Sequence, residues 1–278
     1  MAGQMPYLEF LGRLHEALRP ATYLEVGVRA GDSLALSRSK SIGIDPDFAI
    51  KCPITCDVAL FKTTSDEYFS RPDPLAPFHG APADLAFIDG MHLFEFALRD
   101  FINVERCSSP SSVVVFDDIF PRKVDEAARD RHTRVWTGDV YKIVEVLRQY
   151  RPDLTLLLVD TGPTGLLLVT GLDPDNTVLT DHYDEIVEKY VVDDPQDVPP
   201  AILNREGALA PEKLLRSPVW GSLRRSRRPW VSRERARVEM TEALERPTIY
   251  RARRRELRRT ATRTVKQGLR QVKALRSR

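Results

Sequence analysis

The first 200 residues predict an α/β fold in which helices cover both faces of a doubly wound, mostly parallel sheet. Short apolar strands alternate with helical segments there, as they do when crossover helices join parallel strands. Three of these strands end in an aspartate, at Asp45, Asp89 and Asp117, and a glycine-containing turn follows the first strand. Because ligands bind at the carboxyl ends of strands in such sheets, these residues should converge on one crevice.

The first elements follow from local periodicity. Residues 7–18 have the apolar spacing of a helix and end before Pro20. Residues 23–28 form a short apolar strand, and the turn after it leads into a helix that begins near Asp32. Residues 42–44 are the second strand. Helix, strand, helix and strand thus alternate from the start of the chain.

The middle of the domain repeats this alternation. Residues 64–69 predict a short helix with Ser65 as its cap. A proline-rich loop separates this helix from a strand at 85–88, which is followed by a helix at 93–105. Residues 113–116 are an entirely apolar strand, as expected for the buried centre of a parallel sheet.

The domain closes with a helix and two strands. Residues 140–150 are helical, and the strands at 154–159 and 165–169 flank a turn at 161–164, which suggests a hairpin. After residue 200 the α/β pattern fades. We therefore expect a domain over residues 1–200 and an extension over residues 201–278.

Charge divides the chain in a similar place. Residues 217–278 hold 20 of the 42 Lys and Arg residues but only five of the 40 Asp and Glu residues, so an acidic body carries a strongly basic tail. Apolar residues recur every three or four positions from Leu257 to Leu275, which predicts an amphipathic helix. Such a helix suits an anionic surface or the acidic body of a neighbouring subunit in a homo-oligomer. The alternative is a solvated, partly disordered tail.

Three sequence features bear on the cellular location of the protein. No run reaches the roughly 18 apolar residues of a membrane span, and the first ten residues lack a secretory signal pattern. The three cysteines, Cys52, Cys56 and Cys107, are too few for a disulfide framework and read as free thiols. These features predict a cytoplasmic protein.

The turn after the first strand reads LEVGVRAGDS and contains Glu25, Gly27 and Gly31. The glycines let the backbone approach a ligand closely. A dinucleotide-binding turn needs a third glycine, and Glu25 would repel a pyrophosphate, so a nicotinamide-dependent oxidoreductase is disfavoured. A carboxylate here suits a cationic ligand instead. At the end of the second strand, Asp45 is placed to accept hydrogen bonds from a ribose, whereas Asp47 should face solvent.

Three carboxylates and a histidine follow the next two strands. Asp89 and His92 lie in IDGMH, and Asp117 and Asp118 lie in FDDI. The three aspartates form a candidate Mg²⁺ site, because hard cations prefer oxygen ligands. His92 is then a candidate general base toward a hydroxyl. Alternatively, Asp118 is a helix cap and His92 has only a hydrogen-bonding role.

Residues from about 20 to 175 resemble class I S-adenosylmethionine-dependent methyltransferases, which have a Rossmann-like fold. More narrowly, they resemble the group that includes macrolide and other sugar O-methyltransferases. The matching runs, in the family's order, are YLEVGVRAGDS, IGIDPD, TSDEYF, LAFIDGMHLFEFALRD and VVVFDDI. The resemblance implies S-adenosylmethionine as cofactor, with contacts to Glu25, Gly27, Gly31, Ser33, Asp45 and Asp89.

The same resemblance implies a metal site formed by Asp89, Asp117 and Asp118. In the catechol type of the family a lysine base follows the first ligand by three residues, and His92 holds that position here. The implied reaction is methylation of a hydroxyl on a saccharide or small molecule, with Mg²⁺ or another divalent cation.

Other interpretations remain open at this level. One is a metal-independent small-molecule methyltransferase in which His92 is the only base. Another is an RNA-associated methyltransferase or binding module that uses the basic tail, although Trp220 and Trp230 supply few aromatic platforms and nucleic acid is disfavoured. Trp136 and Asp139 are candidates for the acceptor side, or else a packing residue and a helix cap.

Overall fold

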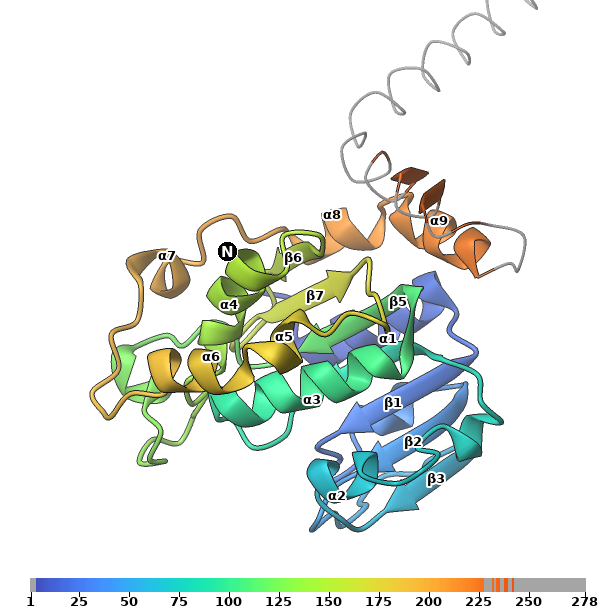
Figure 1. The fold of residues 1–278 in the computed structure, drawn as a ribbon, viewed down its shortest axis with the longest axis horizontal. Coiled ribbons are helices and arrows are strands. Elements are labelled where there is room, and N and C mark those ends of the chain that lie inside the picture. The colour runs from blue at the N-terminus through green and yellow to red at the C-terminus, as the bar shows by residue number, and fades with distance from the viewer. Residues whose placement is uncertain (1–3, 228–231, 233, 236–237, 240–241, 243–278) are drawn as a thin grey trace, which may run out of the picture.

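The computed structural model describes residues 4–227, 232, 234–235, 238–239 and 242, and it contains a seven-stranded sheet (Figure 1). The strand order is β3-β2-β1-β4-β5-β7-β6, and β7 runs in the direction opposite to the other six strands. The strands are β1 (Thr22–Val26), β2 (Lys40–Ile44), β3 (Val58–Phe61), β4 (Ala83–Ile88), β5 (Ser108–Phe116), β6 (Thr155–Val159) and β7 (Leu166–Thr170). The order reverses between β1 and β4, which confirms the predicted doubly wound, mostly parallel sheet.

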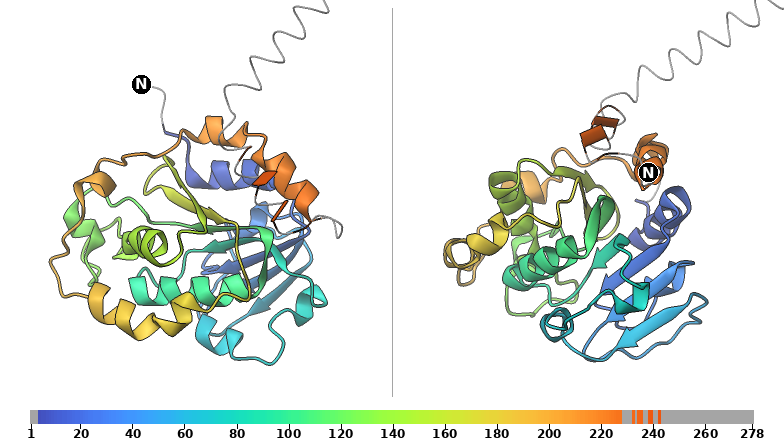
Figure 2. Two further views of the ribbon diagram at one scale, coloured as in Figure 1. Left: turned by 45° about the horizontal axis from the view of Figure 1, so that its top comes forward. Right: turned by 45° about the vertical axis from the view of Figure 1, so that its right-hand side comes forward.

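Helices cover both faces of this sheet (Figure 2). They are α1 (Tyr7–Leu18), α2 (Ser65–Phe69), α3 (Phe94–Arg106), α4 (Ile143–Tyr150), α5 (Val178–Asp181), α6 (Tyr183–Tyr190), α7 (Pro200–Leu203), α8 (Pro211–Leu215) and α9 (Val219–Ser226). Alternate residues of each central strand serve opposite faces, because strand side chains have a period of two. In β4, Ile88 packs with the cluster that includes α3 and α4, whereas Phe87 packs with the cluster that includes α1, α8 and α9.

The described start of the basic extension lies on the sheet's α1 side. Trp220 and Leu223 of α9 are buried there in the same apolar cluster as α1. Arg224 and Arg227 donate hydrogen bonds to backbone carbonyls at the end of α1, where cations favour the helix dipole. The predicted amphipathic helix at 257–275 lies outside the described residues.

Three local features differ from the sequence-based expectations. Near Asp32 the chain forms only a short 3₁₀ turn, Leu34–Leu36, in place of an α-helix. Strand β3 (Val58–Phe61) was not predicted, although all four of its residues are apolar. Thr64, not Ser65, caps α2, because its extended backbone lets its hydroxyl accept from the N–H of Glu67 in a reciprocal capping box.

Two further expectations concern the ends of the sheet and the membrane. The strands β6 and β7 pair antiparallel around residues 160–165, so the predicted hairpin is confirmed. Within the described part of the chain, none of the helices has the length and apolar character needed to cross a membrane.

Candidate active site

The crevice forms where β1 and β4 end side by side, and Gly27 makes this approach possible. Gly27 has a φ of +89°, and a Cβ atom there would lie 1.9 Å from the backbone oxygen of Asp89. A side chain at this position would therefore separate the loops that follow the two strands. Gly31, with a φ of +87°, supplies the second turn of the same loop.

Glu25 lies beneath this loop and is completely buried. Its carboxylate accepts hydrogen bonds from the Tyr23 hydroxyl at 2.5 Å and from the Ser33 hydroxyl at 2.7 Å. Burial raises the pKa of Glu25 to about 7, and the two hydrogen bonds oppose that rise. Ser33, a predicted cofactor contact, therefore already serves to hold Glu25 at the base of the loop.

Asp45 shapes the edge of the same loop. One carboxylate oxygen accepts from the backbone N–H of Arg29 at 2.7 Å, and the other accepts from that of Asp47 at 2.6 Å. The loops after β1 and β2 are thus tied together at the position predicted to hold a ribose. The side chain of Asp47 is 96% exposed, which confirms that it faces solvent.

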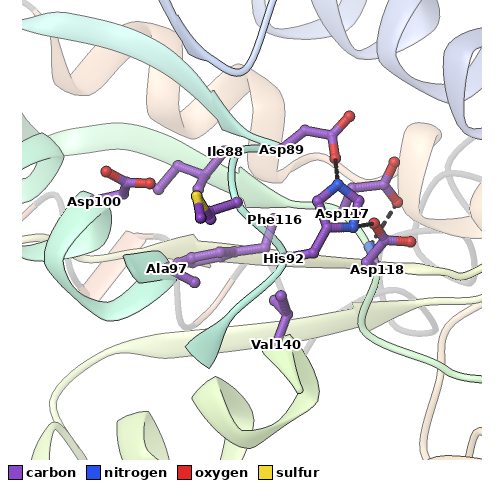
Figure 3. A pocket seen from close by; sticks show the side chains of 11 residues that line it. Ile88, Asp89, His92, Ala97, Asp100, Phe116, Asp117, Asp118 and Val140 are labelled. Atoms are coloured by element: carbon purple, nitrogen blue, oxygen red, sulfur yellow. Dashed lines mark hydrogen bonds and ion pairs between the residues drawn. The ribbon is translucent and has the colours of Figure 1, made fainter. Parts of the chain in front are cut away.

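The reaction side of the crevice holds His92 between two carboxylates (Figure 3). His92 Nδ1 lies 2.7 Å from Asp118 Oδ2, and His92 Nε2 lies 3.4 Å from Asp89 Oδ1. One ligand atom from each of Asp89, His92 and Asp118 falls within 4.8 Å of the others. His92 and Asp118 both have positive φ values, 57° and 62°, so the backbone is strained where these side chains meet.

Asp117, the third predicted metal ligand, has different contacts. Its Oδ1 accepts from the backbone N–H of Asp118 at 2.8 Å and from the Thr164 hydroxyl at 3.3 Å. Among the described residues, the compact set of candidate metal-binding atoms contains His92 and not Asp117. Of the three predicted metal ligands, Asp89 and Asp118 therefore lie together. The third member of the set is His92, the predicted base, and not Asp117.

Crowded carboxylates dominate the electrostatics. Burial, followed by the charge of Asp118, raises the pKa of Asp117 to about 8. Burial and the charges of Asp117 and Asp118 raise the pKa of Asp89 well above its usual range. Burial opposes the charged form of His92, but its hydrogen bond with Asp118 and the nearby negative charges raise its pKa. The arrangement attracts positive charge to this end of the crevice.

Trp136 forms a wall beside His92. Their rings stack with centroids 5.1 Å apart and an interplanar angle of 9°. The indole N–H of Trp136 donates to the backbone oxygen of Ala128 at 2.6 Å, which fixes the ring. At Gly138 a Cβ atom would lie 1.7 Å from the backbone oxygen of His92. Residues 136–138 therefore press directly against the His92 peptide.

Asp139 is fully buried and does not reach the crevice surface. Its carboxylate accepts from the backbone N–H of Phe94 at 2.7 Å and pairs with Arg129 at 2.7 Å and Lys142 at 2.9 Å. It caps the start of α3 and not its own segment. Asp139 is thus a helix cap, the alternative to an acceptor-side role, but the helix that it caps is α3 and not the one that follows it.

Tyr7, which the sequence did not single out, packs beside the strand that leads to Asp89. Its ring stacks on Phe87, two residues before Asp89, with centroids 6.5 Å apart. The only local signal, the start of an apolar helix, gives no hint that this residue faces the strand ends. Its proximity depends on how α1 packs across the sheet.

A methyltransferase-domain family model matches residues 54–119. No curated protein matches the chain significantly. Solved structures with a similar arrangement include an O-methyltransferase from Bacillus cereus in complex with S-adenosylhomocysteine, with 14% identity and a TM-score of 0.42, covering 59% of this chain and 80% of the other.

Two further structures give similar values. The O-methyltransferase TomG from Streptomyces achromogenes, involved in tomaymycin synthesis and bound to S-adenosylmethionine, is 19% identical with a TM-score of 0.44 over 60% of this chain and 80% of the other. The methyltransferase PaMTH1 from Podospora anserina, bound to S-adenosylhomocysteine, is 12% identical with a TM-score of 0.45. The match covers 60% of this chain and 78% of the other. The segment 54–119, which contains Asp89, His92, Asp117 and Asp118, is thus the part of the chain that matches a methyltransferase domain.

Proposed function

We propose that this protein is an S-adenosylmethionine-dependent O-methyltransferase that uses a divalent cation. One observation carries the proposal: Asp89, His92 and Asp118 present ligand atoms within 4.8 Å of one another, beside the glycine loop that follows β1. The methyltransferase-domain match over residues 54–119 supports it independently. The sequence resemblance specifies transfer to oxygen.

The side chains fit a hard cation. The Asp89 and Asp118 carboxylates converge beside His92, and the charge of a third carboxylate, Asp117, acts on Asp89. Such a donor set suits Mg²⁺ or Mn²⁺ and leaves room in the coordination sphere for water or an acceptor oxygen. When bound, the cation lowers the pKa of a neighbouring hydroxyl. Asp89 and Asp118 are the residues that would hold it.

The cofactor supplies an electron-poor methyl group on sulfur, and the chain must align it and remove a proton. Glu25 offers negative charge beneath the cofactor loop, and Gly27 allows the close backbone approach. His92 accepts the proton of the acceptor hydroxyl, so that the acceptor oxygen gains the methyl group as the carbon–sulfur bond breaks. Asp118 and Trp136 fix the orientation of the His92 ring. Positioning of this kind accounts for much of the barrier reduction in such transfers.

The acceptor we propose is a hydroxyl group on a saccharide or a glycosylated small molecule. This assignment rests on the resemblance of the IDGMH and FDDI segments to sugar O-methyltransferases. The contact between His92 and Asp118 at 2.7 Å is also compatible with a metal-independent enzyme in which Asp118 orients the base. The metal requirement therefore needs its own test.

Cofactor and metal can be tested before the acceptor is known. Calorimetric titration should show binding of S-adenosylhomocysteine and no binding of NAD. Mn²⁺ binding, followed by electron paramagnetic resonance, should be lost in Asp118→Asn and retained in Asp47→Asn, whose side chain is exposed.

Transfer of a labelled methyl group to a panel of saccharides should then stop with EDTA and return with Mg²⁺. Full activity after exhaustive EDTA treatment would leave the metal-independent enzyme as the correct description. Binding of NAD in place of S-adenosylhomocysteine would overturn the proposed function altogether.

A further inference from the structure

Helix α1 brings its first residue, Tyr7, to the carboxyl edge of the sheet. A short turn connects the end of α1 to the start of β1, so the helix runs back along the sheet antiparallel to that strand. Its 12 residues span roughly 18 Å, and the five residues of β1 span roughly 17 Å. The first turn of α1 therefore lies over the point where β1 ends and the Gly27 loop begins.

Contacts on two sides hold Tyr7 there. Its ring stacks on Phe87 with an interplanar angle of 25°, and Phe87 precedes Asp89 by two residues. Its backbone N–H donates to the oxygen of Gly162 at 2.9 Å, in the β6–β7 turn. The same turn supplies Thr164, whose hydroxyl donates to Asp117. Tyr7 is thus held between β4 and the β6–β7 turn, at the carboxyl edge of the sheet.

The charges of carboxylates from both halves of the crevice act on the Tyr7 hydroxyl. Burial and then the charges of Asp117, Asp89, Asp118 and Asp32 raise its pKa above the ordinary value, so it stays a neutral hydrogen-bond donor. Asp32 belongs to the cofactor loop, and the other three belong to the reaction side. Among the described residues this hydroxyl has no hydrogen-bond partner.

The zwitterionic methionine end of S-adenosylmethionine presents a problem in this setting. Its ammonium and sulfonium groups suit the acidic crevice, but its carboxylate has to bind close to acidic side chains such as Asp32. A carboxylate can bind here only where N–H or O–H donors point at it. The backbone N–H groups of the loop after β1 are one source, and the Tyr7 hydroxyl, on which these carboxylates act, is a side-chain donor that can supply another.

We propose that Tyr7 closes the crevice from the N-terminal helix and donates a hydrogen bond to the methionine carboxylate of the cofactor. This inference rests on the proposed function, because it takes S-adenosylmethionine as the ligand. Tyr7 binds and orients the cofactor; it does not transfer a proton.

The test is calorimetric titration of the full chain with two ligands. S-adenosylhomocysteine carries the amino-acid carboxylate, and 5′-methylthioadenosine lacks it. Tyr7→Phe keeps the ring that stacks on Phe87 and removes only the hydroxyl. Tyr68→Phe is the matched control, since Tyr68 is a buried tyrosine whose hydroxyl donates to the backbone oxygen of Pro74, outside the crevice. Thermal unfolding of each variant checks that it is folded.

The inference predicts that Tyr7→Phe weakens S-adenosylhomocysteine about tenfold or more, as expected for a hydrogen bond to a charged group. Affinity for 5′-methylthioadenosine should stay at the wild-type value, and Tyr68→Phe should change neither affinity.

Two results would overturn the inference while leaving the proposed function intact. One is equal S-adenosylhomocysteine affinity in Tyr7→Phe and wild type. The other is an equal loss for both ligands, which would place the hydroxyl on the adenosine end. Failure of the wild type to bind S-adenosylhomocysteine would overturn the proposed function and the inference together.

Discussion

The carboxylate of Asp139 accepts a 2.7 Å hydrogen bond from the backbone N–H of Phe94, the first residue of α3. Phe94 follows His92 by two residues, and the peptide of His92 is in contact with Gly138. A buried acid distant in sequence therefore fixes the segment that carries the candidate base. Its charge is balanced by Arg129 and Lys142.

Asp139→Asn should lower the Mn²⁺ affinity of the active site as well as the stability of the protein. The amide keeps an acceptor for Phe94 but leaves Arg129 and Lys142 without their shared carboxylate, which costs about 3–5 kcal/mol when a buried pair is broken. Glu105→Gln is the matched control, because Glu105 forms a buried pair with Arg151 in the same core and away from His92. Mn²⁺ affinity, measured where both variants are folded, should fall in Asp139→Asn only. Equal Mn²⁺ affinity in the two variants would reduce Asp139 to a stabilising role.

Gly27→Ala should abolish cofactor binding. Alanine at a φ of +89° costs about 1–2 kcal/mol, and its Cβ would clash with the Asp89 backbone at 1.9 Å. Gly80→Ala provides the comparison, since Gly80 has a φ of +78° but no atom within 4 Å of its Cβ position. Both variants should have a lower melting temperature, because alanine is strained at a positive φ. Only Gly27→Ala should lose S-adenosylhomocysteine binding. Normal binding by Gly27→Ala would mean that the two loops separate without consequence.

Asp100 should make stability fall as the pH rises. Burial raises the pKa of Asp100 from 3.8 to about 7, against a hydrogen bond with Ser65 that lowers it. The folded state therefore keeps a proton that the unfolded state has already lost between these values. The corresponding contribution is fully present below about pH 4 and is lost as the pH rises through 7.

Asp100→Asn removes this titration, so its free energy of unfolding relative to wild type should improve by about 2–3 kcal/mol between pH 5 and pH 8. Urea denaturation at the two pH values measures the difference. Asp47→Asn, with its exposed side chain, should show no such change. A parallel pH dependence in Asp100→Asn and wild type would show that Asp100 is already ionised at pH 5.

Trp220→Ala should destabilise the whole domain, although Trp220 lies in the predicted extension. The indole is buried in the cluster that includes α1, and its N–H donates to the backbone oxygen of Leu214 at 2.8 Å. Loss of such a side chain costs about 3–5 kcal/mol. Val192→Ala, at a side chain that is largely exposed, should cost little. An unchanged melting temperature in Trp220→Ala would mean that α9 does not stabilise the body.

The packing of α9 also determines where a deletion of the tail should begin. To separate an RNA-directed protein from a small-molecule enzyme, the deletion should begin after Arg227, which donates to the end of α1. A cut at 217 would remove buried core residues and confuse binding with folding.

The sequence by itself determined the sheet and the location of the crevice. The apolar runs ending in Asp45, Asp89 and Asp117 specify parallel strands, and parallel strands necessarily bring their carboxyl ends to one edge. Likewise, Gly27 and Gly31 signalled a tight backbone approach, because glycine adopts positive φ at little cost. These properties depend on neighbours along the chain, so local patterns carry them.

Only the tertiary structure decided which side chains meet at that edge. Asp117 and Asp118 are adjacent in sequence, yet a positive φ at Asp118 turns it toward His92 while Asp117 accepts hydrogen bonds from Asp118 and Thr164. Asp139 serves α3, and Tyr7 reaches the crevice because α1 runs back across the sheet. Side-chain direction and long-range packing depend on contacts between residues far apart in sequence, and no periodicity along the chain encodes them.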